Sequence, residues 1–224
     1  MSFDAIIFDM DGVLVDSEVY WLKSRQEFAQ ARGKVWTDAD QRQAMGRNTV
    51  EWAEVMRERL SLDEAAEAIM SEMIDRVKAH YDERLPLRPG ALEAVRVASG
   101  RARVALASGS PTAIIQHVMR LTGLDSVFEV MVYGDDYPNG KPAPDVYLGA
   151  CERLGVDPRR CVGIEDSGNG IRSVVAAGMV CVAAPSPAFP LSEELLALCA
   201  RKVDTMEALT ADFWADLEQT HGQF

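Results

Sequence analysis

Residues 4–18 read DAIIFDMDGVLVDSE, and this stretch decides the fold. A short apolar run, residues 5–8, ends in two carboxylates one residue apart, Asp9 and Asp11, and Gly12 follows at once. Apolar β-formers bounded by a glycine predict a buried strand that runs into a turn. Open α/β sheets bind their ligands at the carboxyl ends of such strands. A charged pair there is costly unless a cation or a proton compensates it, so Asp9 and Asp11 are candidates for a metal or acid–base site.

Asp-x-Asp-Gly also suits a surface turn, because Asp and Gly are common turn residues. The rest of the chain separates the two interpretations. After a boundary marked by Pro86, Pro89 and Gly90, strand-like and helix-like segments alternate. We expect strands at 103–108, 128–133, 160–165 and 179–184, and helices at 111–121, 145–155, 171–178, around 192–200 and around 210–218. This alternation predicts an α/β fold with a parallel sheet covered on both faces.

The block from Glu18 to about Arg84 is helical in pattern, and no strand is evident in it. Ser61 with Glu64 fits a capping box, which predicts a helix from there to about Tyr81. The chain therefore leaves the sheet directly after the Asp pair, builds a helical module and returns. That path would place the module beside the two carboxylates, as a lid. Two independent domains are the less favoured alternative, because the first strand would be left without its sheet.

The composition and net charge limit the classes of function that the chain can have. The 224 residues are 48% hydrophobic and 26% charged, as in a globular protein with one large domain or two unequal ones. A net charge of −12 argues against nonspecific binding to nucleic acid or an anionic membrane, although a local metal ion and lysine still permit a phosphorylated substrate. We find no signal-peptide pattern, no membrane-spanning run and no CxxC among the four cysteines. We therefore expect a cytoplasmic protein with reduced thiols.

Two further strand ends carry residues suited to phosphate. Ser108 and Gly109 follow the strand expected at 103–108, ahead of a helix, where free backbone N–H groups favour anions. An ordinary helix cap at Ser110 or Thr112 is compatible with that interpretation. Lys141 lies in a stiff loop between glycine and proline. A lone lysine is usually just solvated, but a positioned ammonium group neutralises phosphate charge.

A second carboxylate pair, Glu165-Asp166, ends the strand expected at 160–165, and small residues follow it. Glycine there allows a ligand to approach the backbone closely. Oxygen-only sites with few carboxylates suit Mg²⁺, which keeps waters and takes phosphate oxygens. The three histidines all lie outside these segments, which argues against chemistry built on histidine.

At this point the chain resembles the haloacid dehalogenase superfamily of phosphotransferases. The matching residues are Asp9-x-Asp11, Ser108, Lys141 and Glu165-Asp166, in the family's order. Any one of these is weak, whereas four in order are specific. DGVLVDSE, ASGSP, GKPAPD and GIEDSGNG are similar to the β-phosphoglucomutase-like group of sugar-phosphate phosphatases and mutases. The resemblance covers essentially the whole chain. It implies a Rossmann-like three-layer core with a parallel sheet (residues 1–17 and 86–224) and an inserted all-helical cap domain (18–85).

The resemblance also implies a role for each matched residue. Asp9 would be the nucleophile that forms an aspartyl-phosphate, and Asp11 would protonate the leaving oxygen and then deprotonate the attacking water. Mg²⁺ would be held by the Asp9 side chain, the Asp11 backbone carbonyl and Asp166, with Glu165 beside or on the metal. The transferring phosphoryl oxygens would be bound by Ser108, Gly109 and Lys141. Phosphoryl transfer depends mostly on positioning and charge stabilisation, so this set suffices.

The resemblance implies a Mg²⁺-dependent phosphatase of small phosphorylated metabolites, with a sugar-phosphate mutase as the second hypothesis. β-Phosphoglucomutase carries a histidine near the start of its cap, where this chain has Trp21, and basic residues in a cap loop matching AMGRNTVEW, where only Arg47 is basic. These departures favour the phosphatase. Arg47, Trp21 and Trp52 are candidates for contact with the substrate from the cap, in particular Arg47 for its phosphate. Packing between cap helices is the alternative for the tryptophans.

Three other reactions or classes fit less well. A noncatalytic receiver-like module, phosphorylated on an Asp as a signal, accounts for acidic residues and a lysine but not for the helical insert. A glycosyltransferase metal site disagrees with the position of the Asp pair at the start of the chain. A dehalogenase needs neither the acid at Asp11 nor the metal carboxylates. We expect a monomer, since the cap can close the site without a partner, and we expect cap contacts to select the substrate.

Overall fold

The computed structural model describes residues 2–44, 49–186 and 189–222. Its centre is a single sheet of six parallel strands in the order β3-β2-β1-β4-β5-β6. The strands are β1 (Ala5–Phe8), β2 (Arg103–Ser108), β3 (Val130–Tyr133), β4 (Cys161–Glu165), β5 (Val180–Ala183) and β6 (Arg201–Lys202). In the register, Phe8 at the end of β1 lies opposite Leu106 of β2 and Ile164 of β4. Because all strands are parallel, their carboxyl ends meet at one edge, with the end of β1 near its middle.

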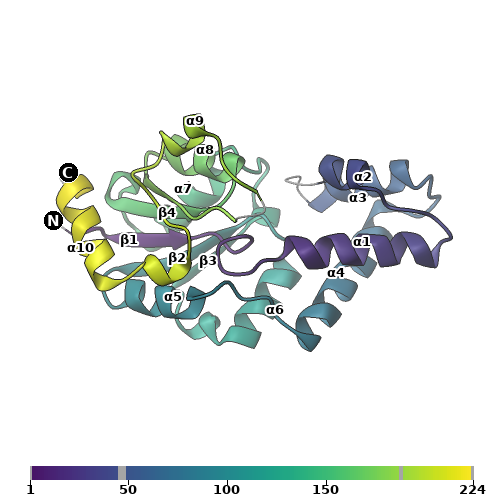
Figure 1. Cartoon of the computed structure of the whole chain (residues 1–224), viewed down its shortest axis with the longest axis horizontal. Helices are drawn as coiled ribbons and strands as arrows, with labels where there is room; N and C mark the ends of the chain where they lie inside the picture. The colour runs from purple at the N-terminus through teal and green to yellow at the C-terminus, as the bar shows by residue number, and fades with distance from the viewer. Residues whose placement is uncertain (1, 45–48, 187–188, 223–224) are drawn as a thin grey trace.

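Helices cover both faces of the sheet (Figure 1). Alternate side chains of β1 belong to opposite hydrophobic clusters. Ile6 and Phe8 belong to one hydrophobic cluster, and Ala5 and Ile7 belong to the other. The first cluster takes in α5 (Ala91–Ser99), α6 (Thr112–Thr122) and α10 (Ala211–His221), and the second takes in α7 (Asp145–Leu154) and α8 (Gly168–Ala176). The predicted parallel sheet covered on both faces is therefore confirmed.

The helical insert forms a separate group beyond the carboxyl end of the sheet (Figure 1). It consists of α1 (Glu18–Ala31), α2 (Asp38–Ala44), α3 (Thr49–Arg59) and α4 (Ala66–Glu83). The first hydrophobic cluster continues into it through fully buried side chains such as Phe28, Met56 and Met73. The α/β fold class with an inserted helical cap is confirmed, while the exact domain limits, 1–17 with 86–224 against 18–85, stay a prediction.

The capping box expected at Ser61 and Glu64 is wrong. Ser61 lies in a turn with a φ of 49°, and α4 begins only at Ala66, with Ala65 at the N-cap and no side-chain cap bond. The Glu64 carboxylate instead accepts two hydrogen bonds from Arg32, at 2.7 Å each. Two charge-assisted hydrogen bonds to a guanidinium group are stronger than a single bond to a backbone N–H, so Glu64 pairs with Arg32 instead of capping the helix.

The carboxyl-terminal part differs from expectation in one element. The helix expected around 192–200 is only the short α9 (Glu193–Leu196), and β6 follows it. The backbone N–H of Ala200 donates to the carbonyl of Cys181 at 2.8 Å, so pairing with β5 ends the helix.

The sequence analysis did not predict the helix α5. Short 3-10 turns lie at Leu124–Ser126, Gly134–Asp136, Pro158–Arg160 and Met206–Ala208.

Two features relate to the expected setting of the protein. None of the helices in the described ranges is long and apolar enough to cross a membrane. The four cysteines are free, and Cys151, Cys161 and Cys181 are buried while Cys199 is half-buried. They pack as thiols in and beside the core, as the sequence predicted.

Candidate active site

The carboxyl ends of the central strands bring three predicted site residues side by side. Ser108 is the last residue of β2 and Glu165 the last of β4, on either side of Asp9 just past the end of β1. All three are buried. The backbone N–H of Asp9 still pairs with the carbonyl of Ile164 at 3.1 Å, which holds the carboxylate at the sheet edge.

Lys141 reaches this edge from the loop before α7 and connects two carboxylates. Its Nζ atom lies 2.8 Å from Oδ1 of Asp9 and 2.6 Å from Oε1 of Glu165, and it also donates to the carbonyl of Ala107 at 3.3 Å. Burial alone would lower the pKa of Lys141, but the charges of Asp9 and Glu165 outweigh burial and raise it. Lys141 is therefore a fixed positive charge in the site.

Glu165 is fully buried, and donors from the protein occupy both of its oxygens. Oε1 accepts from Lys141 and from the Tyr147 hydroxyl at 2.8 Å. Oε2 accepts from the backbone N–H of Asp166 at 3.1 Å and of Ser167 at 3.4 Å, and from the Ser167 hydroxyl at 3.2 Å. With these bonds in place, Glu165 orients Lys141 and the turn that carries Asp166.

Three carboxylates gather closely enough to hold a cation. Oxygens of Asp9, Glu165 and Asp166 lie within 4.8 Å of one another. Burial raises the pKa of Asp9 to about 8 against the opposing charge of Lys141, and burial likewise raises the pKa of Asp166, with Glu165 and Asp9 adding to the effect. One lysine therefore compensates three carboxylates incompletely, and an all-oxygen donor set fits a divalent metal ion.

Gly12 makes room for this group. Its φ is +73°, and a Cβ atom there would overlap the carboxylate of Asp166. The turn after Asp11 therefore requires glycine both for its backbone conformation and for the close approach of Asp166. Since partners already occupy the Glu165 oxygens, Asp9 and Asp166 are the side chains with most to offer a metal. The Asp11 carboxylate is not part of the gathered set.

Asp11 instead faces the serine at the end of β2. Its Oδ2 accepts a hydrogen bond from the Ser108 hydroxyl at 3.2 Å, and that hydroxyl accepts one from the backbone N–H of Ser110 at 3.1 Å. The other oxygen, Oδ1, is buried and has no hydrogen-bond partner within the described residues. A carboxyl group with one oriented oxygen and one unpartnered oxygen suits a group that exchanges a proton with a ligand.

The loops after β2 and β3 meet through two glycines. A Cβ atom at Gly134 would lie 2.8 Å from Cα of Gly109, so the backbones touch there. A Cβ atom at Gly109 itself would meet nothing within 4 Å. The predicted phosphate loop thus leaves open space beside Ser108, with the backbone uncovered by a side chain.

The structure describes two of the three cap residues that were predicted to contact the substrate. Arg47 lies outside the described residues. Trp21 and Trp52 are both buried, and their ring centroids are 5.5 Å apart, so the two tryptophans pack between cap helices. Whether they contact the substrate stays a prediction.

A polar contact beside the site joins the cap to the core. The Thr49 hydroxyl, at the start of α3, donates to Oδ1 of Asp135 at 3.1 Å. Oδ2 of Asp135 accepts from the backbone N–H and the hydroxyl of Thr112, at 2.9 and 3.1 Å. Asp135 thereby connects the start of α3 with the start of α6.

The sequence analysis missed four residues that shape the site: Tyr147, Asp135, Thr49 and Arg88. Tyr147 lies on an apolar helix face, so the sequence pattern predicts a core residue. Only its hydrogen bond to Glu165 in the folded structure shows that it belongs to the site. Asp135 follows a strand, but nothing in the sequence points to Thr49. Arg88 is buried and donates to the carbonyls of Gly12 and Ala184, which anchors the turn after Asp11. In the sequence, only the position of Arg88, a charged residue between the boundary residues Pro86 and Pro89, could have pointed to a special role.

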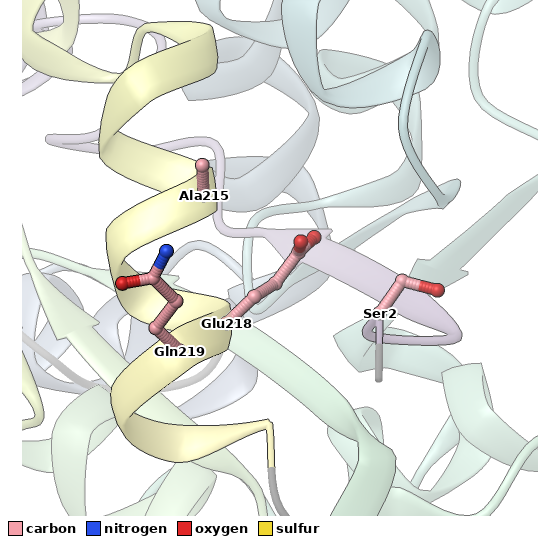
Figure 2. Close-up of a pocket in the computed structure, with 4 residues that line it drawn as sticks. All are labelled: Ser2, Ala215, Glu218 and Gln219. Carbon is pink, nitrogen blue, oxygen red and sulfur yellow. The ribbon is translucent and has the colours of Figure 1, made fainter.

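Surface hollows also lie away from these residues. One, of about 330 Å³, is lined by Ser2, Ala215, Glu218 and Gln219 at the amino end of the sheet, between the first residues and α10 (Figure 2). Its charged residue, Glu218, already pairs with Arg101 at 3.1 Å. The clustered carboxylates and Lys141 lie at the opposite edge of the sheet, so we do not consider this pocket a candidate active site.

The fold and the site together define a capped α/β enzyme with a lysine–carboxylate centre. The model of the haloacid dehalogenase-like hydrolase family matches residues 3–178, so the chain belongs to the haloacid dehalogenase-like hydrolases. A phosphorylated carbohydrates phosphatase of Thermotoga maritima is 36% identical over 177 residues, covering 79% of this chain and 82% of the relative. Hexitol phosphatase B of Escherichia coli K12 is 32% identical over 189 residues, covering 82% and 84%. The solved structure of a putative beta-phosphoglucomutase from Thermotoga maritima has a TM-score of 0.76 and 31% identity, covering 94% and 98%.

Proposed function

We propose that this protein is a Mg²⁺-dependent phosphatase of small phosphorylated metabolites, in particular sugar phosphates, that works through an aspartyl-phosphate on Asp9. The observation that carries the proposal is the position of Asp9, bonded to Lys141 at 2.8 Å beside the Glu165–Asp166 pair. The second acid, Asp11, is bonded to Ser108, and its other oxygen has no hydrogen-bond partner among residues 2–44, 49–186 and 189–222. The names of the two phosphatase relatives support phosphorylated carbohydrates as the substrate class.

In the first half-reaction, an oxygen of Asp9 attacks phosphorus, and the bond from phosphorus to the leaving oxygen breaks. Lys141 and Ser108 balance the charge on the transferring group, with the backbone at Gly109 close by. Asp11, protonated, gives its proton to the leaving oxygen. Asp9 and Asp166, together with the Asp11 carbonyl, would hold Mg²⁺, which would supply positive charge that favours ionised Asp9 and offsets the phosphoryl charge.

In the second half-reaction, a water molecule attacks the aspartyl-phosphate. Asp11 takes a proton from that water, the bond between Asp9 and phosphorus breaks, and inorganic phosphate leaves. The helical cap, in contact with the core through Thr49 and Asp135, excludes bulk water while the first half-reaction proceeds.

A sugar-phosphate mutase is the second candidate, because a solved structure named a putative beta-phosphoglucomutase matches nearly the whole chain. A mutase returns the phosphoryl group to another hydroxyl of the sugar instead of to water. It would need a bisphosphorylated activator, and isomerisation would be faster than phosphate release.

The test is inorganic phosphate release from a panel of hexose, pentose, polyol and small-acid phosphates, with Mg²⁺ and with EDTA. It compares the wild type with Asp9→Asn and, as a matched control, with Asp75→Asn, an exposed change on α4. We expect release that needs both Mg²⁺ and Asp9, with a fall of about 10⁴-fold or more in Asp9→Asn. Unchanged turnover in Asp9→Asn would refute the nucleophile. A stable phosphoaspartate without turnover would favour the receiver-like module.

We also propose the domain limits given above, a cytoplasmic location and a monomeric state. Light scattering coupled to size exclusion tests the last of these. A mass near 24.6 kDa is expected for the monomer, and twice that value would reject it.

A further inference from the structure

Two of the four cysteines face each other outside the candidate active site. The Sγ atoms of Cys181, in β5, and Cys199, in the segment between α9 and β6, lie 3.7 Å apart. The hydrogen bond from the backbone N–H of Ala200 to the carbonyl of Cys181, at 2.8 Å, holds the two segments side by side. A disulfide would require the two sulfurs to approach each other by only about 1.6 Å. Cys181 and Cys199, called the redox pair below, are therefore placed for oxidation.

The two thiols of the redox pair differ in access. Cys181 is 2% exposed, whereas Cys199 is half-buried, so a small oxidant reaches Cys199 first. A hydrogen bond with the Cys181 thiol lowers the pKa of the Cys199 thiol, which increases the thiolate fraction of the accessible sulfur. The thiols of Cys151 and Cys161 also interact, but these residues are 1% and 0% exposed. Access therefore distinguishes the redox pair from the second pair of cysteines.

The short helix α9 connects the redox pair to the turn that carries Asp166. The Cys199 thiol donates to the carbonyl of Leu195, on α9, at 3.5 Å. The Leu195 side chain packs against Gly168, where a Cβ atom would lie 2.9 Å from Cδ1 of the leucine. Gly168 begins α8 two residues after Asp166, and α9 lies beside α8 (Figure 1). A movement of Cys199 can thus reach the metal carboxylates through two contacts.

Closing a disulfide would move the α9 side of this connection. Cys181 is fixed, because β5 pairs with β4 on one side and with β6 on the other. The approach of the sulfurs therefore falls on Cys199 and on the end of α9. A disulfide also has no S–H group, so the Leu195 carbonyl loses the thiol that donates to it. Both effects shift Leu195 against Gly168, beside the turn of Asp166.

We propose that hydrogen peroxide converts Cys181 and Cys199 into an intramolecular disulfide, which weakens Mg²⁺ binding through α9; the second half of this inference rests on the proposed Mg²⁺ site. The Cys199 thiolate attacks one peroxide oxygen, the O–O bond breaks, and the hydroxide that leaves takes up a proton to become water. The Cys181 thiol then gives up its proton, its sulfur attacks the sulfenic acid of Cys199, and the S–O bond breaks to release a second water. Two thiols are oxidised and one peroxide is reduced.

The first test maps disulfides by mass spectrometry in the full chain after exposure to hydrogen peroxide. We expect the loss of two hydrogen atoms, a peptide with Cys181 linked to a peptide with Cys199, and reversal by dithiothreitol. Cys199→Ser should prevent the link, whereas Cys151→Ser, the matched control in the buried pair, should leave it unchanged. In Cys181→Ser, the oxidation of Cys199 should stop at a sulfenic acid that dimedone labels. A link between Cys151 and Cys161 that forms first, or no link at all, would overturn the proposal.

The second test measures Mg²⁺ binding by isothermal titration calorimetry, with the reduced and the disulfide-bonded protein. We expect the Kd for Mg²⁺ to rise about tenfold on oxidation, as for loss of a contact that supports a metal ligand. Cys199→Ser keeps a hydroxyl that can donate to the Leu195 carbonyl, so its Kd should not change with peroxide. An unchanged Kd in disulfide-bonded wild type would reject the connection to the metal site.

Leu195→Ala tests the path through α9. This variant keeps both thiols but removes the side chain that packs against Gly168, so the disulfide should still form while the Kd for Mg²⁺ no longer depends on it. A tenfold rise that persists in Leu195→Ala would reject this path. Neither readout uses phosphate release, so failure of the phosphatase proposal is seen separately in the substrate panel. If the reduced wild type binds no Mg²⁺, the connection to the metal site is rejected, and the disulfide is decided by mass alone.

Discussion

The ammonium group of Lys141 lies 2.6 Å from the fully buried carboxylate of Glu165, although Lys141 comes from the loop before α7 and Glu165 is the last residue of β4. The same nitrogen bonds Asp9 at 2.8 Å. Lys141 is thus a structural counter-charge, and in the proposed mechanism it also binds a phosphoryl oxygen. The two duties have different experimental signatures, since one concerns stability and the other turnover.

Replacing Lys141 by methionine should leave two buried carboxylates without their cation. We expect the free energy of unfolding in EDTA to fall by about 3 kcal/mol, because removing one partner of a buried ion pair leaves an uncompensated charge. Urea denaturation measures this loss. Lys202→Met is the control: its pair with Asp204 is exposed, and its loss should cost well under about 1 kcal/mol. Equal losses in the two variants would contradict the structural role.

Tyr147→Phe removes one hydrogen bond to Glu165 and nothing else of similar size. We expect a loss of about 1.5 kcal/mol in stability, typical of a bond to a charged acceptor, and a several-fold decrease in kcat as Lys141 loses orientation. Thermal unfolding and phosphate release measure the two effects. Tyr137→Phe, whose hydroxyl lies against Gly149, controls for loss of a hydroxyl near α7. A normal kcat in Tyr147→Phe would argue that Glu165 needs no such support.

Gly12→Ala and Gly33→Ala separate backbone strain from crowding of the metal group. Both glycines have a positive φ, but a Cβ atom at Gly33 would meet nothing within 4 Å, whereas one at Gly12 would overlap Asp166. Gly33→Ala should therefore lower the free energy of unfolding only by the backbone strain, about 1 kcal/mol. Gly12→Ala should cost more and should also raise the Mg²⁺ concentration needed for half-maximal activity. The same Mg²⁺ requirement in both variants would show that Asp166 is not a ligand.

Asp40 makes cap stability depend on pH. It accepts from the Thr37 hydroxyl and backbone N–H at the start of α2, and from Arg59 at 2.6 Å. The Thr37 hydroxyl bond is the largest cause that lowers the pKa of Asp40, and Arg59 adds to it. Because the folded pKa lies below the unfolded one, this stabilisation is present above about pH 4 and is lost as pH falls through the folded pKa.

Asp40→Asn should consequently lower stability by about 1 kcal/mol at pH 7, in line with loss of a helix cap. The difference from wild type should shrink toward pH 2. Asp38→Asn, in the first turn of the same helix, is the control and should have a smaller effect. Melting curves across pH give the comparison, and a deficit that persists at pH 2 would show that Asp40 acts through shape instead of charge.

Much of the site could be read from the sequence because local patterns determine it. A run of apolar β-formers followed by Asp9 or by Glu165 predicts both a buried strand and the edge at which its last residue emerges. Parallel pairing then brings such ends together without further information, which is why Asp9, Ser108 and Glu165 were predicted as neighbours. Helix caps were less predictable. Thr37 and Asp40 bond reciprocally, while Ser61 and Glu64, with a similar spacing, do not.

By itself, the sequence determined the parallel α/β core, the helical insertion after the first strand and the carboxylates, serine and lysine at the strand ends. Each of these follows from periodicity and from residues a few positions apart. Only the tertiary structure decided that Tyr147 donates a hydrogen bond to Glu165, that Glu64 pairs with Arg32 instead of capping α4, and that Gln41 bonds both Arg25 and Glu18. These contacts join residues from different elements, and their strength depends on burial and on competing partners. Neither quantity exists until the chain has folded.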